Sequence, residues 1–416
     1  MTATAAATER QRGLAERFGA VRRRTLELCK PLTPEDMMVQ SCAEASPAKW
    51  HLAHTAWFFE SFVLREFVPG YKPFDEDFRW LFNSYYVSYA SFPEKRLRAS
   101  FSRPGLDEVL RYRAHVDAAM ERLMEGDVPA EALRRTELGA NHEEQHQELL
   151  LTDILHALYS NPLKPVYAGS EREAGAARAM GWESFGGGMR EIGHAGEGFC
   201  YDNELARHKV WLEPHALADR LVTNGEYAEF MADGGYERAE LWLSAGWDAV
   251  EREGWRAPLY WTERDGAWRI FTLRGEQALE ARRGAAVSQV SFFEADAYAR
   301  WAGRRLATEF EWEAAAAEQR IAGNLLDAGR LTPGAATTDG QWFGDCWEWT
   351  ASAYLGYPGF KPLEGALGEY NGKFMSGQMV LRGGSCATPL AHIRASYRNF
   401  FAPETRWQFA GIRLAK

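Results

Sequence analysis

Two histidines four residues apart, His142 and His146, are the residues whose type and spacing most directly suggest chemistry. They lie in residues 141–148 (NHEEQHQE), which open an apolar pattern of helical period that continues to Leu158. Side chains four apart on a helix leave the same face, one turn from each other. Both imidazoles can therefore bind one metal ion, and we expect a metal centre here.

The same residues match His-Glu-x-x-His, the zinc hydrolase signature in which the glutamate, here Glu143, is the general base. Three features count against a hydrolase. Glu144 and Gln145 are polar where such helices usually bury uncharged residues, no Gly-x-x-His follows at metzincin spacing, and no third carboxylate ligand is evident on a later helix. A zinc hydrolase remains one alternative, and a solvated helix face with two unrelated histidines is another.

A third metal ligand can come from His51 or His54, which lie beside Trp50 and Trp57 in a second segment of helical pattern. The two histidines are three residues apart and point in different directions, so either one can face the core. A buried histidine among aromatic residues is more often only hydrogen-bonded than a ligand. Three histidines without a carboxylate suit a transition metal, and open positions on a redox iron can take O2. The pattern does not separate zinc from iron.

Aromatic residues mark two further segments. Tyr85 and Tyr86 lie between predicted helices, where tyrosines usually pack; near a metal they can also act as proton donor or redox partner. Residues 397–409 mix aromatic side chains with arginine. Such a patch can hold a quaternary ammonium by cation–π contact, or it can be ordinary core and rim.

The elements that must position these residues fall into two groups. Four segments of helical periodicity predict an antiparallel bundle whose core can assemble a metal site. They are residues 9–30, about 47–67, 106–125 and 141–158. Residues 161–182 read as a linker, and the remainder, rich in glycine turns and tryptophan, predicts a mixed α+β domain with helices near 223–232 and 291–302.

Composition limits the class of protein. The 416 residues favour two domains, and the net charge of −10 argues against nucleic acid as a partner. No apolar run approaches the ~20 residues of a membrane helix, so we expect no membrane partner. The five cysteines are scattered and odd in number, which fits a reducing cytoplasm and not a disulfide framework.

Six motifs, in order along nearly the whole chain, together resemble the ergothioneine-biosynthesis sulfoxide synthases. They are residues 46–55 (SPAKWHLAHT), 81–86 (LFNSYY), 142–148 (HEEQHQE), 347–350 (WEWT), 380–385 (VLRGGS) and 397–413 (YRNFFAPETRWQFAGIR). The resemblance implies a two-domain α+β protein. Residues 1–165 would form a DinB-like four-helix bundle, and residues 180–416 a formylglycine-generating-enzyme-like domain of the C-type-lectin-like fold.

The resemblance also implies an activity. Family enzymes hold non-heme Fe(II) with three histidines and use O2 to join a thiol sulfur, from cysteine or γ-glutamylcysteine, to the imidazole of hercynine (Nα-trimethylhistidine). The ligands carried over are His54, His142 and His146, with His51 as a neighbour. Tyr85 or Tyr86 would be the acid or redox partner. The substrate-binding residues carried over are Gln145, Asn83, Asn399, Phe400, Phe401 and Arg406.

The chain departs from the family pattern directly after Tyr86. Where a Gly-Pro-Arg-His-Pro-like segment is usual, this sequence reads VSYASFPEKR over residues 87–96. Gln289 stands at a second position where the family commonly has histidine. The first departure bears on the donor, because the loop of residues 87–98 contains Lys95, Arg96 and Arg98, which can pair with a carboxylate or bond sugar hydroxyls. A selenosugar donor, as in the similar selenoneine synthases, is therefore an alternative to a thiol.

Overall fold

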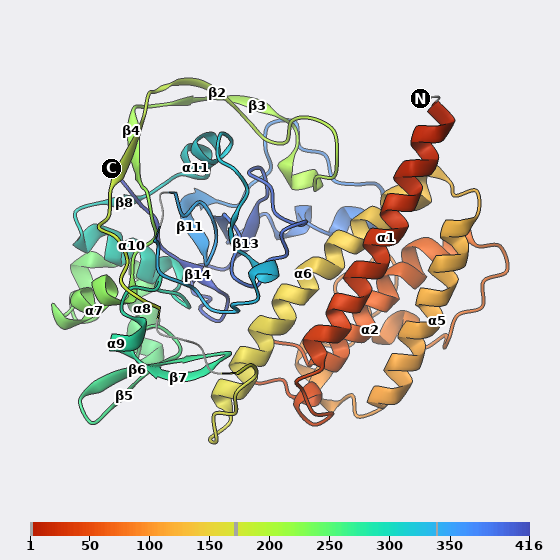
Figure 1. Cartoon of the computed structure of the whole chain (residues 1–416), viewed down its shortest axis with the longest axis horizontal. Coiled ribbons are helices and arrows are strands. Elements are labelled where there is room, and N and C mark those ends of the chain that lie inside the picture. The colour runs from red at the N-terminus through yellow and green to blue at the C-terminus, as the bar shows by residue number, and fades with distance from the viewer. Residues whose placement is uncertain (1–2, 170–173, 338–339) are drawn as a thin grey trace. The chain divides into compact units, whose positions relative to one another are not determined.

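The computed structural model describes residues 3–169, 174–337 and 340–416, and the chain forms two compact units (Figure 1). The first unit comprises Met1–Ser160 together with Glu364–Glu369. The second comprises Asn161–Leu363 and Tyr370–Lys416. The first is helical and the second mixes short strands with helices, which confirms the predicted α+β class with two domains.

Within residues 3–160, four long helices build the first unit, as the apolar periodicity predicts. They are α1 (Ala3–Cys29), α2 (Ala48–Phe59), α5 (Leu106–Glu125) and α6 (Ala130–Ser160). Helix α2 packs against both α5 and α6, and α1 runs along α6. All twelve residues of α2 are buried, which explains why this helix has no polar face. The shorter elements of the unit are η1 (Asp36–Met38), the π-helical turn η2 (Glu60–Leu64), α3 (Arg65–Phe67), α4 (Phe78–Leu81), η3 (Lys95–Ser100) and η7 (Gly365–Glu369).

Helix α6 begins at Ala130, eleven residues before the predicted start at Asn141. The added turns carry charged side chains, including the pair of Glu131 with Arg135 four residues later, and so lack the apolar stripe by which the helix was predicted. Gly139 lies in these turns because the ring of Phe59 packs directly on its backbone. A Cβ at this position would be 2.5 Å from Phe59 Cε1. The glycine thus lets α2 and α6 approach closely just before the two histidines of α6.

The described part of the second unit contains five small sheets. The two larger sheets run in the orders β1-β4-β15-β8 and β13-β12-β11-β14, and only β11 and β14 pair in parallel within them. The strands of these sheets are β1 (Trp182–Phe185), β4 (His215–Ala218), β15 (Leu414–Ala415), β8 (Arg305–Leu306), β13 (Asn399–Phe401), β12 (Met379–Arg382), β11 (Trp347–Ala353) and β14 (Ala410–Gly411). The smaller sheets are the hairpin β2 (Gly188–Ile192) with β3 (His208–Leu212), the meander β5 (Trp261–Arg264), β6 (Ala267–Thr272) and β7 (Gly275–Ala278), and the parallel pair β9 (Gly323–Asn324) with β10 (Phe343–Gly344).

The second unit contains more helices than the two predicted. Helices α7 (Asn224–Ala232) and α10 (Phe292–Trp301) confirm the prediction, but α8 (Ser244–Glu253), α9 (Leu279–Arg282) and α11 (Glu309–Ala316) were missed. These helices are ten residues or shorter, so apolar periodicity says little about them. A local signal was present for α11, because Thr308 and Glu311 form a capping box at its start.

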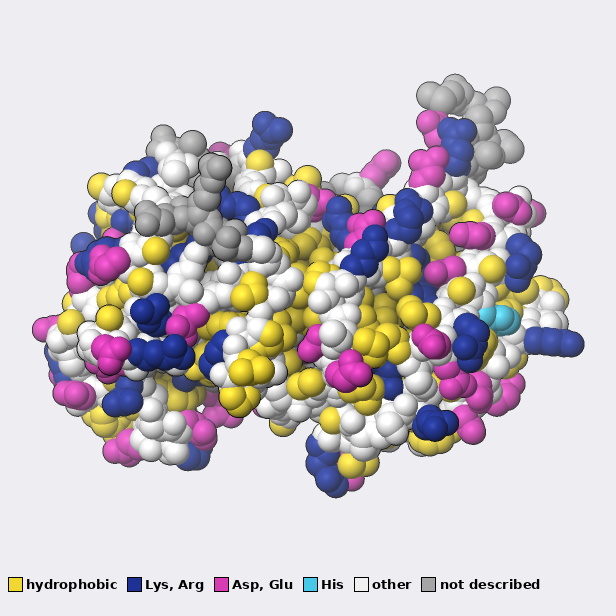
Figure 2. Space-filling model, turned by 60° about the horizontal axis from the view of Figure 1, so that its bottom comes forward, with side chains coloured by type: hydrophobic (Ala, Val, Ile, Leu, Met, Phe, Trp, Pro, Cys, Tyr) yellow, Lys and Arg dark blue, Asp and Glu magenta, His cyan; other side chains and the backbone are white. Residues whose placement is uncertain are grey.

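The predicted linker packs on the second unit at residues 167 and 168. The backbone N–H groups of Tyr167 and Ala168 both donate to the carbonyl of Leu273, at 3.1 and 2.9 Å. Residues 170–173 of this predicted linker lie outside the described residues. Basic and acidic side chains are interspersed over the face shown in Figure 2. None of the helices in the described ranges has both the length and the apolarity needed to cross a bilayer.

Candidate metal centre

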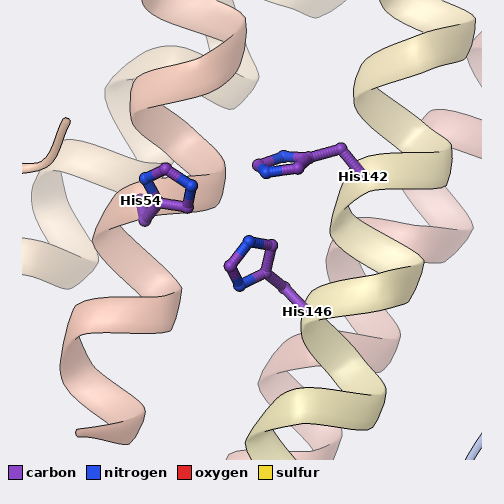
Figure 3. A group of neighbouring side chains, drawn as sticks. All are labelled: His54, His142 and His146. Atoms are coloured by element: carbon purple, nitrogen blue, oxygen red, sulfur yellow. The ribbon is translucent and has the colours of Figure 1, made fainter. Parts of the chain in front are cut away.

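Three histidine side chains from two neighbouring helices converge in the core of the first unit. Helix α2 supplies His54, and α6 supplies His142 and His146 (Figure 3). One ring nitrogen of each lies within 4.8 Å of those of the other two, and all three residues are buried. The spacing of four on α6 and the close packing of α2 on α6 produce this cluster. A single ion can reach all three nitrogens.

The ring of His54 is fixed by its surroundings. It stacks between Trp50 and Trp57, with ring centroids at 4.4 and 5.2 Å and both interplanar angles at 13°. These indoles lie four residues before and three after it on α2, and so on the same face. His54 Nδ1 lies 2.7 Å from the carbonyl oxygen of Phe82 and donates to it. His54 Nε2 is buried and has no hydrogen-bond partner among the residues that the structure describes.

The three imidazoles are neutral at physiological pH. Burial lowers the pKa of His142 to about 3. Burial, followed by the neighbouring His142, lowers the pKa of His54 and of His146 well below the ordinary value of 6.5. A neutral imidazole keeps one nitrogen lone pair, which is the form that binds a metal. The orphaned Nε2 of His54 and this neutral donor set fit a divalent transition metal.

His51 lies beside the cluster and contacts His146 through Nδ1 of that ring. Its Nδ1 is 2.8 Å from Nδ1 of His146, and its Nε2 is 3.0 Å from Oδ2 of Asp153. All three side chains are buried. Asp153 was not among the site residues predicted from the sequence. It lies seven residues after His146, two helical turns along the same face, and that spacing was a usable signal.

Glu143, the glutamate of the His-Glu-x-x-His match, belongs to a buried ion-pair cluster. Its carboxylate accepts from Arg22 at 2.9 Å and from Thr25 at 2.6 Å, and it also pairs with Arg113. Burial alone would raise the pKa of Glu143, but Arg113 and Arg22 outweigh it and lower the pKa to about 2. A carboxylate bound in this way is a poor proton acceptor. The zinc hydrolase alternative therefore lacks its general base.

Replacing Glu143 by glutamine is expected to destabilise the fold. The change leaves the buried cations Arg22 and Arg113 without their shared anion, which costs about 3–5 kcal/mol. The free energy of unfolding from urea titration at pH 7 measures it. Glu137→Gln is the matched control, because the pair of Glu137 with the exposed Arg10 contributes about 0–1 kcal/mol.

The stability lost in Glu143→Gln should depend on pH. The pKa of Glu143 is about 2 in the folded chain against 4.5 ordinarily, so its contribution is complete above pH ~4.5 and is lost as the pH falls towards 2. The stability difference between wild type and Glu143→Gln should shrink in that window. If Glu143→Gln were as stable as wild type at pH 7, this carboxylate would have no structural role.

Tyr85 and Tyr86 stack on each other, with ring centroids 4.6 Å apart. Tyr86 is fully buried against Trp57, at 5.6 Å, whereas Tyr85 is half-buried. The side chain of Asn83 shapes this turn: its amide donates to the carbonyl of Tyr86 at 3.1 Å and accepts from the N–H of Tyr86 at 3.2 Å. Trp57 thus contacts both His54 and Tyr86, so the tyrosine turn is tied to the histidine cluster through one indole.

The basic residues of the loop after Tyr86 have different environments. The guanidinium of Arg98 is buried over the ring of Trp50, 3.4 Å from its centroid, and donates to Ser46 and Ser84 at 2.8 and 2.9 Å. Arg98 therefore supports the outer face of the indole that stacks on His54. Arg96 is largely exposed and pairs with Glu94.

The remaining predicted substrate residues lie on α6 and in the second unit. Gln145 precedes His146 on α6 and is half-buried. Asn399, Phe400 and Phe401 form β13, where Phe400 stacks on Tyr354 at 4.0 Å with an interplanar angle of 9°.

Arg406 is buried within the second unit. Its guanidinium donates to Glu294 at 2.8 Å and lies 4.3 Å from the ring centroid of Trp255. The guanidinium charge of Arg406 is therefore already paired within the second unit, and no substrate is needed to neutralise it.

Comparison with known proteins covers both units. Residues 17–151 match the DinB superfamily, and residues 178–342 and 340–416 match the sulfatase-modifying factor enzyme 1-like domain. These matches confirm the predicted DinB-like and formylglycine-generating-enzyme-like folds. A formylglycine-generating enzyme from Streptomyces coelicolor is 37% identical over 39% of this chain and 53% of its own length.

Two relatives match along almost the whole chain. The hercynine oxygenase of Mycolicibacterium smegmatis is 32% identical over 97% of this chain and 98% of its own length. The hercynine oxygenase of Mycobacterium tuberculosis is 33% identical over the same shares of the two chains.

Proposed function

Because the chain belongs to the hercynine oxygenase family, the ergothioneine-biosynthesis sulfoxide synthases, we propose that it joins a thiol sulfur to the imidazole of hercynine with Fe(II) and O2. The observation that carries the proposal is the cluster of His54, His142 and His146 in the core of a chain that matches these oxygenases nearly end to end. Cysteine or γ-glutamylcysteine is the proposed donor. The proposed coupling is a step of ergothioneine biosynthesis.

The proposed metal ligands are His54 through Nε2, His142, and His146 through Nε2. For His54 and His146 the other ring nitrogen is occupied, by the carbonyl of Phe82 and by His51 respectively. Three neutral imidazoles add no negative charge, so a bound Fe(II) keeps its full charge. Bound iron would supply Lewis acidity, a redox centre and open positions at which reactants gather.

The proposed overall reaction balances without a further reductant. A thiol loses its S–H hydrogen and hercynine loses a ring C–H hydrogen as the C–S bond forms. O2 takes four electrons, two from this coupling and two from oxidation of the sulfur. One oxygen atom becomes the sulfoxide oxygen, and the other leaves as water with the two hydrogens.

The protein's own part in this reaction is positioning and proton transfer. We assign the proton donor to the tyrosine pair, since Trp57 ties its turn to His54. The trimethylammonium of hercynine has no N–H to donate, so its recognition needs aromatic faces and acceptor atoms. The side chain of Gln145, which directly precedes His146 on α6, is the proposed acceptor contact.

An oxygen electrode tests the proposal. The full-length protein, loaded with Fe(II), is expected to consume O2 rapidly only with both hercynine and a donor present, and mass spectrometry should find the coupled product. Cysteine, γ-glutamylcysteine and a selenosugar are compared at saturating hercynine. The selenosugar is included because the loop at residues 87–96 differs from the usual family segment.

The controls separate the alternatives. Omitting hercynine should leave only slow oxidation of the donor, and omitting O2 should leave no coupled product. Preference for the selenosugar would move the assignment to a selenoneine synthase. Tight zinc binding without any hercynine-dependent O2 uptake would overturn the proposal.

A further inference from the structure

Two buried side chains, Asp153 and His51, form a hydrogen-bonded series that ends at Nδ1 of the proposed ligand His146. Asp153 Oδ2 lies 3.0 Å from His51 Nε2, and His51 Nδ1 lies 2.8 Å from His146 Nδ1. Asp153, His51 and His146 are 6%, 2% and 9% exposed, so water competes little for these contacts.

The positions of the ring hydrogens on His51 and His146 follow from the carboxylate of Asp153. The carboxylate of Asp153 can only accept, so His51 Nε2 carries the hydrogen that bonds it. With its hydrogen on Nε2, His51 offers Nδ1 as the acceptor, and the contact of the two Nδ1 atoms assigns His146 Nδ1 as the donor. His146 therefore carries its ring hydrogen on Nδ1, which leaves the lone pair on Nε2.

We propose that His51 and Asp153 are positioning residues of the metal centre, which hold His146 in the tautomer and orientation that present Nε2 to the ion. Metal-bound histidines commonly donate their other N–H to a carboxylate or carbonyl, and such partners fix the ring and raise its basicity. Here the carboxylate acts through an intervening imidazole. The inference rests on the metal centre of the proposed function, and not on the substrates.

Asp153, at the start of this hydrogen-bonded series, connects the two helices that carry the proposed ligands. Asp153 lies on α6, and the same Oδ2 atom accepts the backbone N–H of Ser46 at 2.8 Å, just before α2 begins. His51 stands on α2 itself. The Asp153 carboxylate thus fixes the start of α2 and the ring of His51 together, and through His51 the ring of His146 on α6.

Cobalt(II) titration of metal-free, full-length protein tests the proposal without any turnover. His51→Phe removes the acceptor for His146 and should weaken cobalt binding by about 10- to 100-fold, the range found for lost outer partners of ligands. His51→Asn is the matched control, because its side-chain oxygen can take the place of Nδ1 as acceptor. We expect it to bind cobalt within a few-fold of wild type. Asp153→Asn should give an intermediate loss.

A second measurement needs no variant. Nitrogen-15 spectra of the histidine rings in the metal-free wild type should show His146 with its hydrogen on Nδ1. In His51→Phe the same ring should exchange between both tautomers, a change that a merely space-filling role for His51 would not cause. If His51→Phe fails to fold, the wild-type spectrum and the Asp153→Asn titration still decide.

Three outcomes would overturn the inference. They are an Nε2–H tautomer of His146 in the metal-free wild type, equal cobalt affinity of wild type and His51→Phe, and equal losses in His51→Phe and His51→Asn. A wild type that binds no transition metal would overturn the proposed function as well. A wild type that binds cobalt, with unchanged variants, would overturn this inference alone.

Discussion

Replacing His142 by alanine is expected to abolish stoichiometric iron binding and with it the coupling of the donor to hercynine. Two of the three converging nitrogens would remain, one from each helix, and the cavity left on α6 would admit water. Losing an outer partner of a metal ligand already costs about 10- to 100-fold in affinity or activity, so loss of a ligand should exceed this. Iron content by elemental analysis and hercynine-dependent O2 uptake are the measurements.

His156→Ala provides the control for the first prediction. His156 lies on the same helix, outside the cluster, and its ring contacts Ser41 at 2.7 Å. The His156→Ala variant should keep the iron content and the rate of hercynine-dependent O2 uptake of wild type. Iron content at the wild-type level in His142→Ala would refute the ligand assignment, whereas loss of iron in both variants would indicate general damage to α6.

Removing a tyrosine hydroxyl should give the second large effect. General acid catalysis typically contributes ~10²–10⁴-fold, so we expect the coupling rate to fall by that factor when the catalytic tyrosine becomes phenylalanine. The larger loss should occur in Tyr85→Phe, because its half-buried ring can reach a substrate, whereas Tyr86 is enclosed by Trp57 and Phe62. Donor oxidation without coupling should then make up more of the O2 uptake.

The comparison of Tyr85→Phe with Tyr86→Phe supplies its own control. Both changes keep an aromatic ring in place, so iron content and thermal stability should stay near wild type. Product analysis distinguishes coupled product from oxidised donor. Wild-type rate and product distribution in both variants would contradict a catalytic role for this pair.

Periodicity and spacing predicted the bundle well because its helices are long. The spacing of His142 and His146 fixes their common face whatever surrounds them. The start of α6 was missed because its first turns are held by charge pairs and by the approach of Phe59 to Gly139, a contact between residues eighty positions apart. No local pattern contains that contact.

Other features of the site depend on partners that only the fold brings together. The spacing of His51 and His54 left either free to face the core, and the decision depends on Asp153 and on the carbonyl of Phe82. Arg98 reads as a free cation in the sequence, but the fold places it over Trp50. Glu143 reads as a base, but Arg22 and Arg113 from two other helices bind it.

The clamping of His54 between two indoles has a consequence for metal choice. Because the ring is held by stacking and by Phe82, its rotational entropy is already lost on folding, and any divalent ion of suitable size would find this proposed ligand in place. Imidazole sites bind Cu(II), Ni(II) and Zn(II) more tightly than Fe(II), in the Irving–Williams order. If His54, His142 and His146 bind iron as proposed, this rigid, all-imidazole site would exert little selectivity of its own, and correct metallation would depend on which ions are supplied.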